Sequence, residues 1–184
     1  MQSLKTDRLE LREFEPEDSR QLFELYGLEE TSRYESWTPH TSIDETRSLL
    51  DYWLSRRDDK PRTDYTLAID LEGEFIGLIG LELGFGTETD DLRAGFVGYR
   101  LHPSRWGNGY ATESGKKILK FGFEDLKLHR IHSGCVVSNV ASIKVLEKSG
   151  FVQEGRTRAS FPIDDTWHDY LLFGVLNSEW PRAR

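Results

Sequence analysis

Two glycines lie where an expected strand gives way to an expected helix, in the segment from Leu101 to Glu113. They are Gly107 and Gly109, and both precede the first turn of that helix. The first N–H groups of a helix have no acceptor inside the helix, and the helix dipole adds positive charge there. Glycine also lacks the Cβ atom that would keep an anion away from the backbone. The segment therefore predicts a site for a phosphate group.

A dinucleotide-binding turn is one interpretation of these glycines. The run from Gly107 to Thr112 follows the dinucleotide fingerprint, except that Thr112 stands where the third glycine belongs. A nicotinamide-dependent oxidoreductase is therefore an alternative. Against it, the run lies late in the chain, after an expected antiparallel hairpin. The chain has no Gly-Lys-Ser/Thr run, which excludes a Walker-type phosphate loop.

Hydrophobic periodicity predicts the elements that hold this turn. Leu9 and Leu11 alternate with charged residues, as in a strand, and Ser42 with Glu45 forms a capping box at the start of a helix. The chain is expected to form seven strands and four helices. Their order along the chain predicts an α/β (α+β) fold with a mixed sheet flanked by helices. The expected strands are 7–14, 65–71, 75–83, 95–101, 129–137, 151–161 and 167–176, and the expected helices are 16–27, one beginning at Ser42, 109–126 and 140–149, with an irregular segment at 33–40 and a loop at 84–94.

Three local signals refine these elements. Gly98 interrupts strand 95–101 and indicates a bulge or a close backbone approach. Asn139 is a good N-cap for helix 140–149. Gly150 and Phe151 supply the left-handed residue and the apolar contact that follow a helix end.

Length and composition limit the class of protein. A length of 184 residues favours a single domain over residues 1–184. One cysteine excludes an internal disulfide and a multi-cysteine metal site. The N-terminus has no apolar leader, and no run of about 18 apolar residues occurs. We therefore expect a soluble, cytoplasmic protein that acts without a membrane.

Charge is distributed unevenly along the chain. The net charge of −8 argues against a nucleic-acid surface and favours a cationic partner. Residues 95–158, in contrast, carry 11 basic and 5 acidic side chains, a net charge of +6. This positive stretch contains the glycine turn and indicates a bound anion. Basic side chains on two solvent-facing helices are the alternative explanation.

Separated segments resemble the GNAT superfamily of acyl-CoA-dependent N-acetyltransferases, and in particular its RimJ/RimL branch, which includes ribosomal-protein N-terminal acetyltransferases. The resemblance spans nearly the whole chain. It implies a mostly antiparallel sheet with a splayed central strand pair, and transfer of an acetyl group from acetyl-CoA to a primary amine. The segments are Thr6 to Arg12, Trp106 to Glu113, Asn139 to Phe151, Trp167 to Tyr170 and Glu179-Trp180.

The resemblance also implies roles for individual residues. The amides from Gly107 to Thr112 bind the CoA pyrophosphate, and the preceding strand pairs with the pantetheine arm through its backbone. Asn139 hydrogen-bonds that arm, and Ser142 lies near the sulfur. From the residues alone, helix capping explains Asn139 and Ser142 equally well. The implied catalytic residue is Ser142, and the implied cofactor-binding residues are Tyr99, Arg100, Leu101, Arg105, Trp106, Gly107, Asn108, Gly109, Tyr110, Ala111, Thr112, Asn139, Lys144 and Lys148.

The implied mechanism is direct attack of a neutral amine on the thioester in a ternary complex. Backbone amides on the splayed strand polarise the carbonyl group, and Ser142, or a water that it holds, protonates the departing thiolate. A general base is harder to assign, because Phe96 and Ser160 stand where an acidic residue would be a natural candidate. The other candidates are Asp164, Asp165, His168 and Asp169.

A site with weak base assistance favours α-amines as acceptors. An α-amine with a pKa near ~8 is about a tenth neutral at pH 7, whereas a lysine amine near ~10.4 is neutral in less than about one part in a thousand. The expected acceptor is therefore a protein N-terminus or a small-molecule amine. A non-catalytic CoA-binding module is a further alternative, because the acid–base set is incomplete. Both a monomer and a homodimer are consistent with the sequence.

The remaining reactive residues favour structural roles. Cys135 lies in an apolar strand and is expected to be a core thiol. His129 and His132 are three residues apart on that strand, so their side chains face opposite ways and no metal site is expected.

Overall fold

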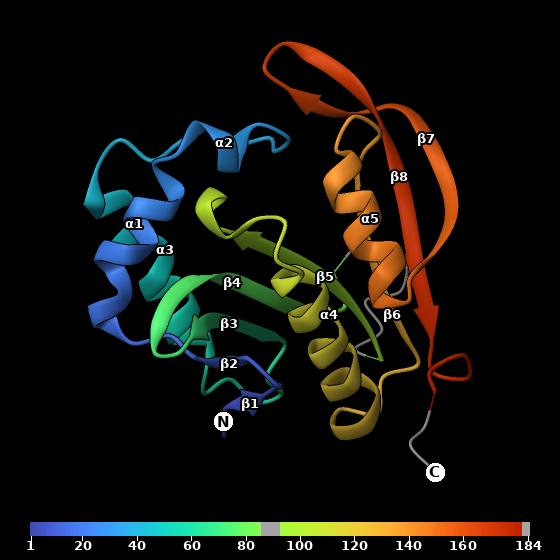
Figure 1. The fold of residues 1–184 in the computed structure, drawn as a ribbon, viewed down its shortest axis with the longest axis horizontal. Helices are drawn as coiled ribbons and strands as arrows, with labels where there is room; N and C mark the ends of the chain where they lie inside the picture. Colours follow the sequence, from blue (N-terminus) through green and yellow to red (C-terminus); the bar gives the residue numbers. More distant parts are fainter. Residues whose placement is uncertain (86–92, 182–184) are drawn as a thin grey trace.

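The computed structural model describes residues 1–85 and 93–181, which form one eight-stranded sheet. The strand order is β1-β2-β3-β4-β5-β6-β8-β7 (Figure 1). Every neighbouring pair is antiparallel except β5 and β6, which run parallel. The mixed, mostly antiparallel sheet of the sequence prediction is thus confirmed. The strands are β1 (Leu4–Lys5), β2 (Leu9–Glu13), β3 (Asp64–Leu71), β4 (Glu74–Leu83), β5 (Ala94–Leu101), β6 (Arg130–Val136), β7 (Val152–Ile163) and β8 (Thr166–Leu176).

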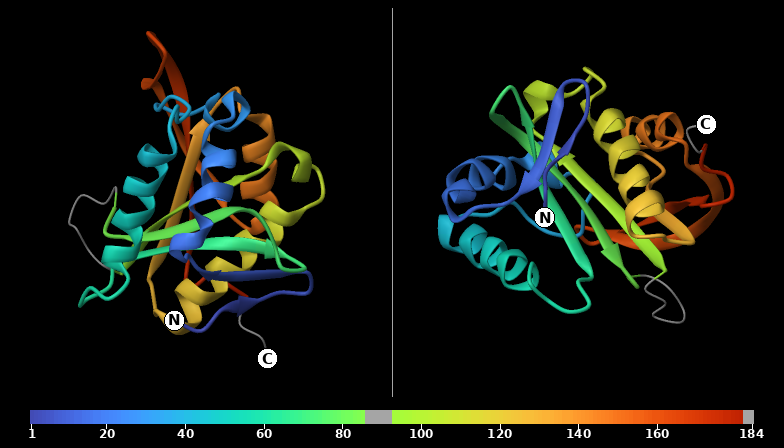
Figure 2. Two further views of the ribbon diagram at one scale, coloured as in Figure 1. Left: turned by 90° about the vertical axis from the view of Figure 1, so that its left-hand side faces the viewer. Right: turned by 90° about the horizontal axis from the view of Figure 1, so that it is seen from below.

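Helices cover both faces of this sheet. Helices α4 and α5 lie on one face and α1 and α3 on the other (Figure 2). Side chains alternate along a strand, so β4 sends Ile79 and Leu81 towards α4 and Leu78 towards α1 and α3. The helices are α1 (Ser19–Tyr26), α2 (Glu29–Ser32), α3 (Ile43–Arg56), α4 (Tyr110–Lys120) and α5 (Val140–Ser149), with 3₁₀ turns at Pro16–Asp18 and Pro103–Arg105 and a π-helical turn, Phe121–Asp125, that continues α4.

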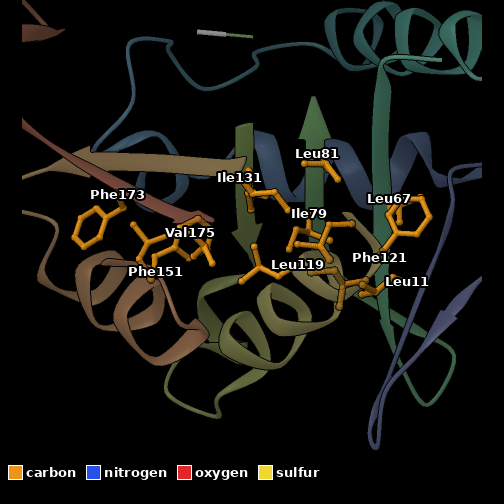
Figure 3. Packing of buried hydrophobic residues seen from close by; sticks show 14 of the residues in the cluster. Leu11, Leu67, Ile79, Leu81, Leu119, Phe121, Ile131, Phe151, Phe173 and Val175 are labelled. Carbon is orange, nitrogen blue, oxygen red and sulfur yellow. The ribbon is translucent and has the colours of Figure 1, made fainter. Parts of the chain in front are cut away.

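The larger apolar core lies between the sheet and helices α4 and α5 (Figure 3). Leu119 of α4 and Phe121 of the following π turn pack there against the strands, together with Ile131 of β6. A Cβ atom on Gly122 would lie 2.5 Å from Cδ1 of Ile131. The small residue at this position therefore lets the helical segment approach the sheet.

Three predicted helix boundaries have the expected contacts. The Ser42 side chain accepts a hydrogen bond from the backbone N–H of Glu45. Asn139 caps α5 through its side-chain oxygen, and Gly150 ends that helix in the left-handed conformation with a φ of 107°. Local turn chemistry thus sets these boundaries.

The structure adds two short elements to the seven predicted strands and four predicted helices. β1 is two residues long and pairs with β2 through Leu4 and Leu11. α2 is four residues long and precedes the irregular segment 33–40. Segments this short show no hydrophobic period, so pattern analysis missed them. The predicted loop 84–94 falls mostly on residues 86–92, which lie outside the described part of the chain, and Ala94 belongs to β5.

The central strands β5 and β6 separate after three residue pairs. Ala94, Gly95 and Phe96 pair with Arg130, Ile131 and His132, respectively, and the remaining residues of both strands diverge. Just past the last pair, Ser133 donates a hydrogen bond from its hydroxyl group to the carbonyl oxygen of Val97, at 2.7 Å. This geometry confirms the splayed strand pair.

Of the two alternatives given for Gly98, a bulge or a close backbone approach, the bulge is wrong. β5 keeps an unbroken register with β4 from Gly95 to Leu101, with Gly98 opposite Gly80. The divergence from β6 therefore begins after Phe96 without any local irregularity in β5.

Candidate active site

A cavity of about 1460 Å³ occupies the opening between β5 and β6. Tyr99 of β5 lines this cavity and faces α4 and α5, and Ser142 of α5 lines it on the same side. Glu82 and Phe96 are paired across β4 and β5 and face α1 and α3, and both line the same cavity. The cavity therefore reaches both faces of the sheet.

We call the part on the α4 and α5 side the donor wall and the part on the α1 and α3 side the acceptor wall. The donor wall contains the predicted site residues Tyr99, Leu101, Arg105, Trp106, Gly107, Gly109, Tyr110, Ala111, Thr112, Asn139, Ser142, Lys144 and Lys148. The acceptor wall contains Glu30, Glu35, Trp53, Thr66, Glu82, Phe96 and Arg100.

The glycine turn has the backbone conformation that an anion site needs. Gly107 and Gly109 have φ values of 79° and 82°, in the left-handed region that glycine adopts without steric cost. Gly109 is the N-cap of α4 and supplies no side chain to cap its first amides. Trp106 donates from Nε1 to the carbonyl oxygen of Leu101 at 2.8 Å, which ties the turn to the end of β5. The amides at the start of α4 thus face the cavity without a capping side chain.

Asn108 has a different place from the other predicted residues. Its side-chain nitrogen donates to the carbonyl oxygens of Arg105 and Trp106, at 3.3 and 3.0 Å. It is exposed and is absent from the cavity wall. Asn108 therefore shapes the turn from outside.

A pair of hydroxyl groups links β5 to the start of α5. The hydroxyl oxygens of Tyr99 and Ser142 are 2.7 Å apart, and the Tyr99 hydroxyl also lies 3.3 Å from the carbonyl oxygen of Ser142. Burial raises the pKa of Tyr99, so this phenol stays protonated. The Ser142 N–H donates to Oδ1 of Asn139 at 3.1 Å, which confirms the capping role of Asn139. The sequence analysis placed Tyr99 beside the cofactor through its backbone and missed its hydroxyl contact.

Basic side chains along the donor wall differ in whether they form an ion pair within the protein. Lys144 and Lys148 of α5 line the cavity as predicted, and Lys116 of α4 joins them. Arg105 also lines it, but its guanidinium group is paired with Glu74 at 2.5 Å. The lysines therefore remain the main source of positive charge for an anion at this wall.

Arg100 presents its side chain to the acceptor wall. Its guanidinium carbon lies 4.6 Å from the ring centroid of Tyr26 and 4.5 Å from that of Trp37. One guanidinium nitrogen is 3.7 Å from Oε1 of Glu35. On the donor side, Arg100 can therefore offer only its backbone, and its side chain holds segment 33–40 over the cavity.

The acceptor wall carries carboxylates that the sequence analysis did not single out. Burial, with the nearby Asp64 as a further cause, raises the pKa of Glu82. Burial also raises the pKa of Glu35, against the opposite effect of Arg100. Asp64 lies directly across from Glu82 in the β3–β4 pairing. These carboxylates come from separate parts of the chain, and no motif marks them.

The four acidic or histidine residues considered as general bases lie away from the cavity wall. Asp169 accepts hydrogen bonds from the Arg156 side chain and from the Ala159 amide, which lower its pKa. Asp164 and Asp165 lie between β7 and β8, at the end of the hairpin that projects past the rest of the molecule (Figure 1). His168 is paired with Phe161 in that hairpin. Phe96 and Ser160 do line the cavity, at the positions noted for a missing acid.

Cys135 is buried in the core and also touches the cavity. Burial raises its pKa to about 11, so the thiol is protonated at neutral pH. His132 contacts the carbonyl oxygen of Phe85 through Nε2 at 2.9 Å, and His129 precedes β6. Within the described residues, no three His, Cys, Asp or Glu side chains gather as metal ligands do.

A sheet that opens in its centre, with a glycine turn and uncapped helix amides on one side, is the arrangement that the resemblance implies for an acyl-CoA-dependent transferase. Residues 8–152 match the family model of the acetyltransferase (GNAT) domain, and the chain therefore belongs to the GNAT family. Members of this family use acetyl-CoA and transfer its acetyl group to amines, so the protein is a GNAT N-acetyltransferase. The nicotinamide-dependent oxidoreductase and the non-catalytic module find no support in this match.

The chain is similar to relatives over nearly its full length. It is 28% identical to the uncharacterized N-acetyltransferase p20 of Bacillus licheniformis, over 98% of this chain and 99% of the relative. A crystal structure of a GNAT acetyltransferase from Bacillus anthracis superposes with a TM-score of 0.82 and 25% identity, over 96% of this chain and 99% of that one. A RimL ribosomal-protein α-N-acetyltransferase in complex with coenzyme A superposes with a TM-score of 0.83 and 20% identity, over 95% and 98%. The RimJ/RimL resemblance is thus confirmed at the level of the fold.

Within the described residues, no helix has the length and apolar character needed to cross a membrane.

Proposed function

We propose that this N-acetyltransferase acetylates a cationic primary amine, either the α-amine of a protein N-terminus or a small-molecule amine, by direct attack in a ternary complex. The observation that carries the proposal is the single cavity that reaches both faces of the sheet at the opening between β5 and β6. Two substrates that enter from opposite faces can meet there. Such juxtaposition replaces a bimolecular encounter with an oriented one.

The donor wall fits a long, anionic coenzyme. The uncapped amides from Gly107 to Thr112 suit a diphosphate, and Lys116, Lys144 and Lys148 suit the remaining phosphate charge. The backbone of Tyr99 to Leu101 faces the opening where β6 no longer pairs with β5. When bound there, acetyl-CoA supplies an acetyl group activated as a thioester. These are the residues that we propose to hold it.

Ser142 is the proton donor in this proposal: its hydroxyl proton passes to the departing thiolate and is replaced from solvent, and Tyr99 fixes its orientation. When the Tyr99 hydroxyl donates to Oγ of Ser142, the serine proton is directed elsewhere, into the cavity. The raised pKa of Tyr99 keeps the phenol protonated for that purpose. Asn139 anchors the Ser142 amide and so fixes the backbone beneath the hydroxyl group.

The acceptor wall suits a cation with modest need for a base. The carboxylate groups of Glu35 and Glu82 attract an ammonium group, and Phe96 and Trp53 supply apolar surface beside them. An α-amine with a pKa near ~8 reaches its neutral form more easily than a lysine amine near ~10.4. The acceptor wall offers acidic groups with raised pKa values that can accept the proton when the amine loses it.

Two relatives support the proposed acceptor classes. The putative ribosomal N-acetyltransferase YdaF of Bacillus subtilis is 26% identical over 95% of this chain and 94% of the relative. The spermidine N(1)-acetyltransferase of Escherichia coli is 24% identical over 94% of this chain and 88% of the relative. The first name indicates a ribosomal acceptor and the second names the polyamine spermidine.

The test is CoA-thiol release from acetyl-CoA over a panel of acceptors at pH 7.0. The panel contains basic peptides with a free N-terminus, the same peptides with a blocked N-terminus and one internal lysine, and polyamines. We expect turnover of free N-terminal peptides or small amines, and far slower turnover of the blocked peptides. Faster turnover of the blocked peptides, or turnover of no amine at all, would contradict the proposal.

A further inference from the structure

The N-terminal segment Thr6 to Arg8 is fastened to the first turn of α4 through one carboxylate. Oε1 of Glu113 accepts hydrogen bonds from the Thr6 hydroxyl group at 2.6 Å and from the Arg8 amide at 3.0 Å. Oε2 accepts from Nε of Arg8 at 2.7 Å and lies 2.6 Å from a second guanidinium nitrogen. Glu113 thus has both oxygens engaged by residues more than 100 positions away in the chain.

Glu113 lies where a negative charge works against the donor wall. It belongs to the first turn of α4 and lines the cavity beside the glycine turn. A carboxylate near a helix N-terminus stabilises the helix, but it repels a phosphate group bound to the same amides. Burial acts to raise the pKa of Glu113, yet hydrogen bonds from Thr6 and Arg8 hold it below its usual value. The carboxylate is therefore ionised at neutral pH.

Arg8 reaches the turn itself. One of its terminal nitrogens lies 3.6 Å from the place where a Cβ atom on Gly109 would be. Its guanidinium carbon lies 4.5 Å from the ring centroid of Tyr110, the first residue of α4. The side chain is about half exposed, at 46%. A cation therefore lies in contact with the carboxylate of Glu113 and within a few ångströms of the glycine turn whose amides the proposed function gives to the diphosphate.

We propose that Arg8 is a positioning residue for the acyl donor: it neutralises Glu113 and turns its carboxylate away from the diphosphate site at the start of α4. This inference rests on the proposed donor site. It explains why an arginine in the N-terminal segment and a glutamate in the first turn of α4 belong to one site. The negative charge of Glu113 can then stabilise the N-terminus of α4 without repelling the bound diphosphate.

The test measures the dissociation constant of coenzyme A by titration calorimetry for four proteins: wild type, Arg8→Gln, Glu113→Gln and the double variant. Arg8→Gln retains a long side chain that can donate to Glu113 but lacks the charge. We expect it to weaken binding about tenfold, the effect of one uncompensated charge a few ångströms from a phosphate group. The double variant is expected to recover binding to within about threefold of wild type, since no charge remains to oppose the ligand.

Three further measurements separate this role from a purely structural one. Arg8→Lys keeps the charge and is expected to bind coenzyme A almost as wild type does. The KM for S-acetylpantetheine, which lacks the diphosphate, should be unchanged in Arg8→Gln. Arg20→Ala removes the same charge from an exposed site on α1, where Arg20 pairs with Glu24, and should leave binding unchanged.

The outcomes that overturn the inference are distinct from failure of the proposed function. Arg8 has only a structural role if the double variant binds coenzyme A no better than Arg8→Gln does. The same conclusion follows if Arg8→Gln raises the KM for S-acetylpantetheine as much as it raises the dissociation constant of coenzyme A. The melting temperature of each variant checks this directly. If wild-type protein binds no coenzyme A, the proposed donor site itself is wrong, whatever the Arg8 variants do.

Discussion

The donor wall and the acceptor wall are built in different ways. The donor wall contains a backbone site beside its side chains: positive-φ glycines, the uncapped start of α4 and the end of β5. The acceptor wall consists of side chains from separate elements, with Glu82 on β4, Phe96 on β5 and Trp53 on α3. One wall is therefore defined by local chain conformation, and the other by which side chains tertiary packing brings together.

This difference teaches where specificity resides. Backbone amides provide a diphosphate site that does not depend on any one side chain type, so the donor wall fits a ligand common to the family. A side-chain wall changes its charge and shape with single substitutions. Substitutions on the acceptor wall should therefore change the use of the amine, and substitutions on the donor wall the use of coenzyme A, so kinetics should separate the two walls.

The largest expected effect is on the chemical step. Ser142→Ala is expected to lower kcat about a hundredfold, the usual contribution of a positioned proton donor, with little change in either KM. Steady-state kinetics with acetyl-CoA and the best acceptor measure this. Tyr99→Phe removes the partner hydroxyl group and should lower kcat less. An unchanged kcat in Ser142→Ala would limit the Ser142 hydroxyl to its contact with Tyr99 and would remove the proposed proton donor from the donor wall.

Of the two substrates, only coenzyme A should bind more weakly when a methyl group is added to the glycine turn. Gly109→Ala is expected to weaken coenzyme A binding about thirtyfold, since it obstructs charge-assisted hydrogen bonds to the backbone. Gly150→Ala is the matched control, because Gly150 also has a positive φ and lies outside the cavity wall. Both variants should lose similar stability by thermal melting. Equal loss of coenzyme A binding in the two would show that strain, not obstruction, is responsible.

On the acceptor wall, Glu82→Gln is expected to raise the KM of a cationic acceptor about tenfold, the loss of one charge-assisted interaction, and to leave the KM of acetyl-CoA unchanged. Because the pKa of Glu82 is raised, acidification should protonate it, and weaken acceptor binding, at a higher pH than for an exposed glutamate. Glu24→Gln on α1 is the control, since Glu24 lies outside the cavity wall. A change in the KM of acetyl-CoA would break the separation of the two walls.

The smallest effect is expected at Cys135, which contacts both the core and the cavity. Its pKa of about 11 leaves little thiolate at neutral pH, so Cys135→Ser should change kcat less than about twofold if no acyl-cysteine forms. The rate of alkylation by iodoacetamide should rise about tenfold for each pH unit between pH 7 and 9.5, without a plateau. A plateau in that range would indicate a thiolate and would support a covalent route through an acyl-cysteine.

Sequence analysis predicted the donor wall because its determinants are local. Gly107, Gly109 and Asn139 adopt the turn and cap conformations that their residue types favour. The contact between Tyr99 and Ser142 joins residues 43 positions apart, and only the packed sheet brings them together. Glu82 likewise sits in an ordinary strand pattern, with nothing nearby in the sequence to mark it. The four residues considered as general bases lie outside the cavity wall, and sequence could not reveal this because the course of the β7–β8 hairpin decides whether they reach the cavity.

The opening between β5 and β6 also divides the sheet mechanically. A half of five strands, β1 to β5, meets a half of three strands through only three residue pairs. An extended ligand that hydrogen-bonds along β5 would add contacts between these two halves and so stabilise the boundary, which we call the seam. The apoprotein should therefore begin to unfold at the seam, and its melting temperature should climb with each increment of coenzyme.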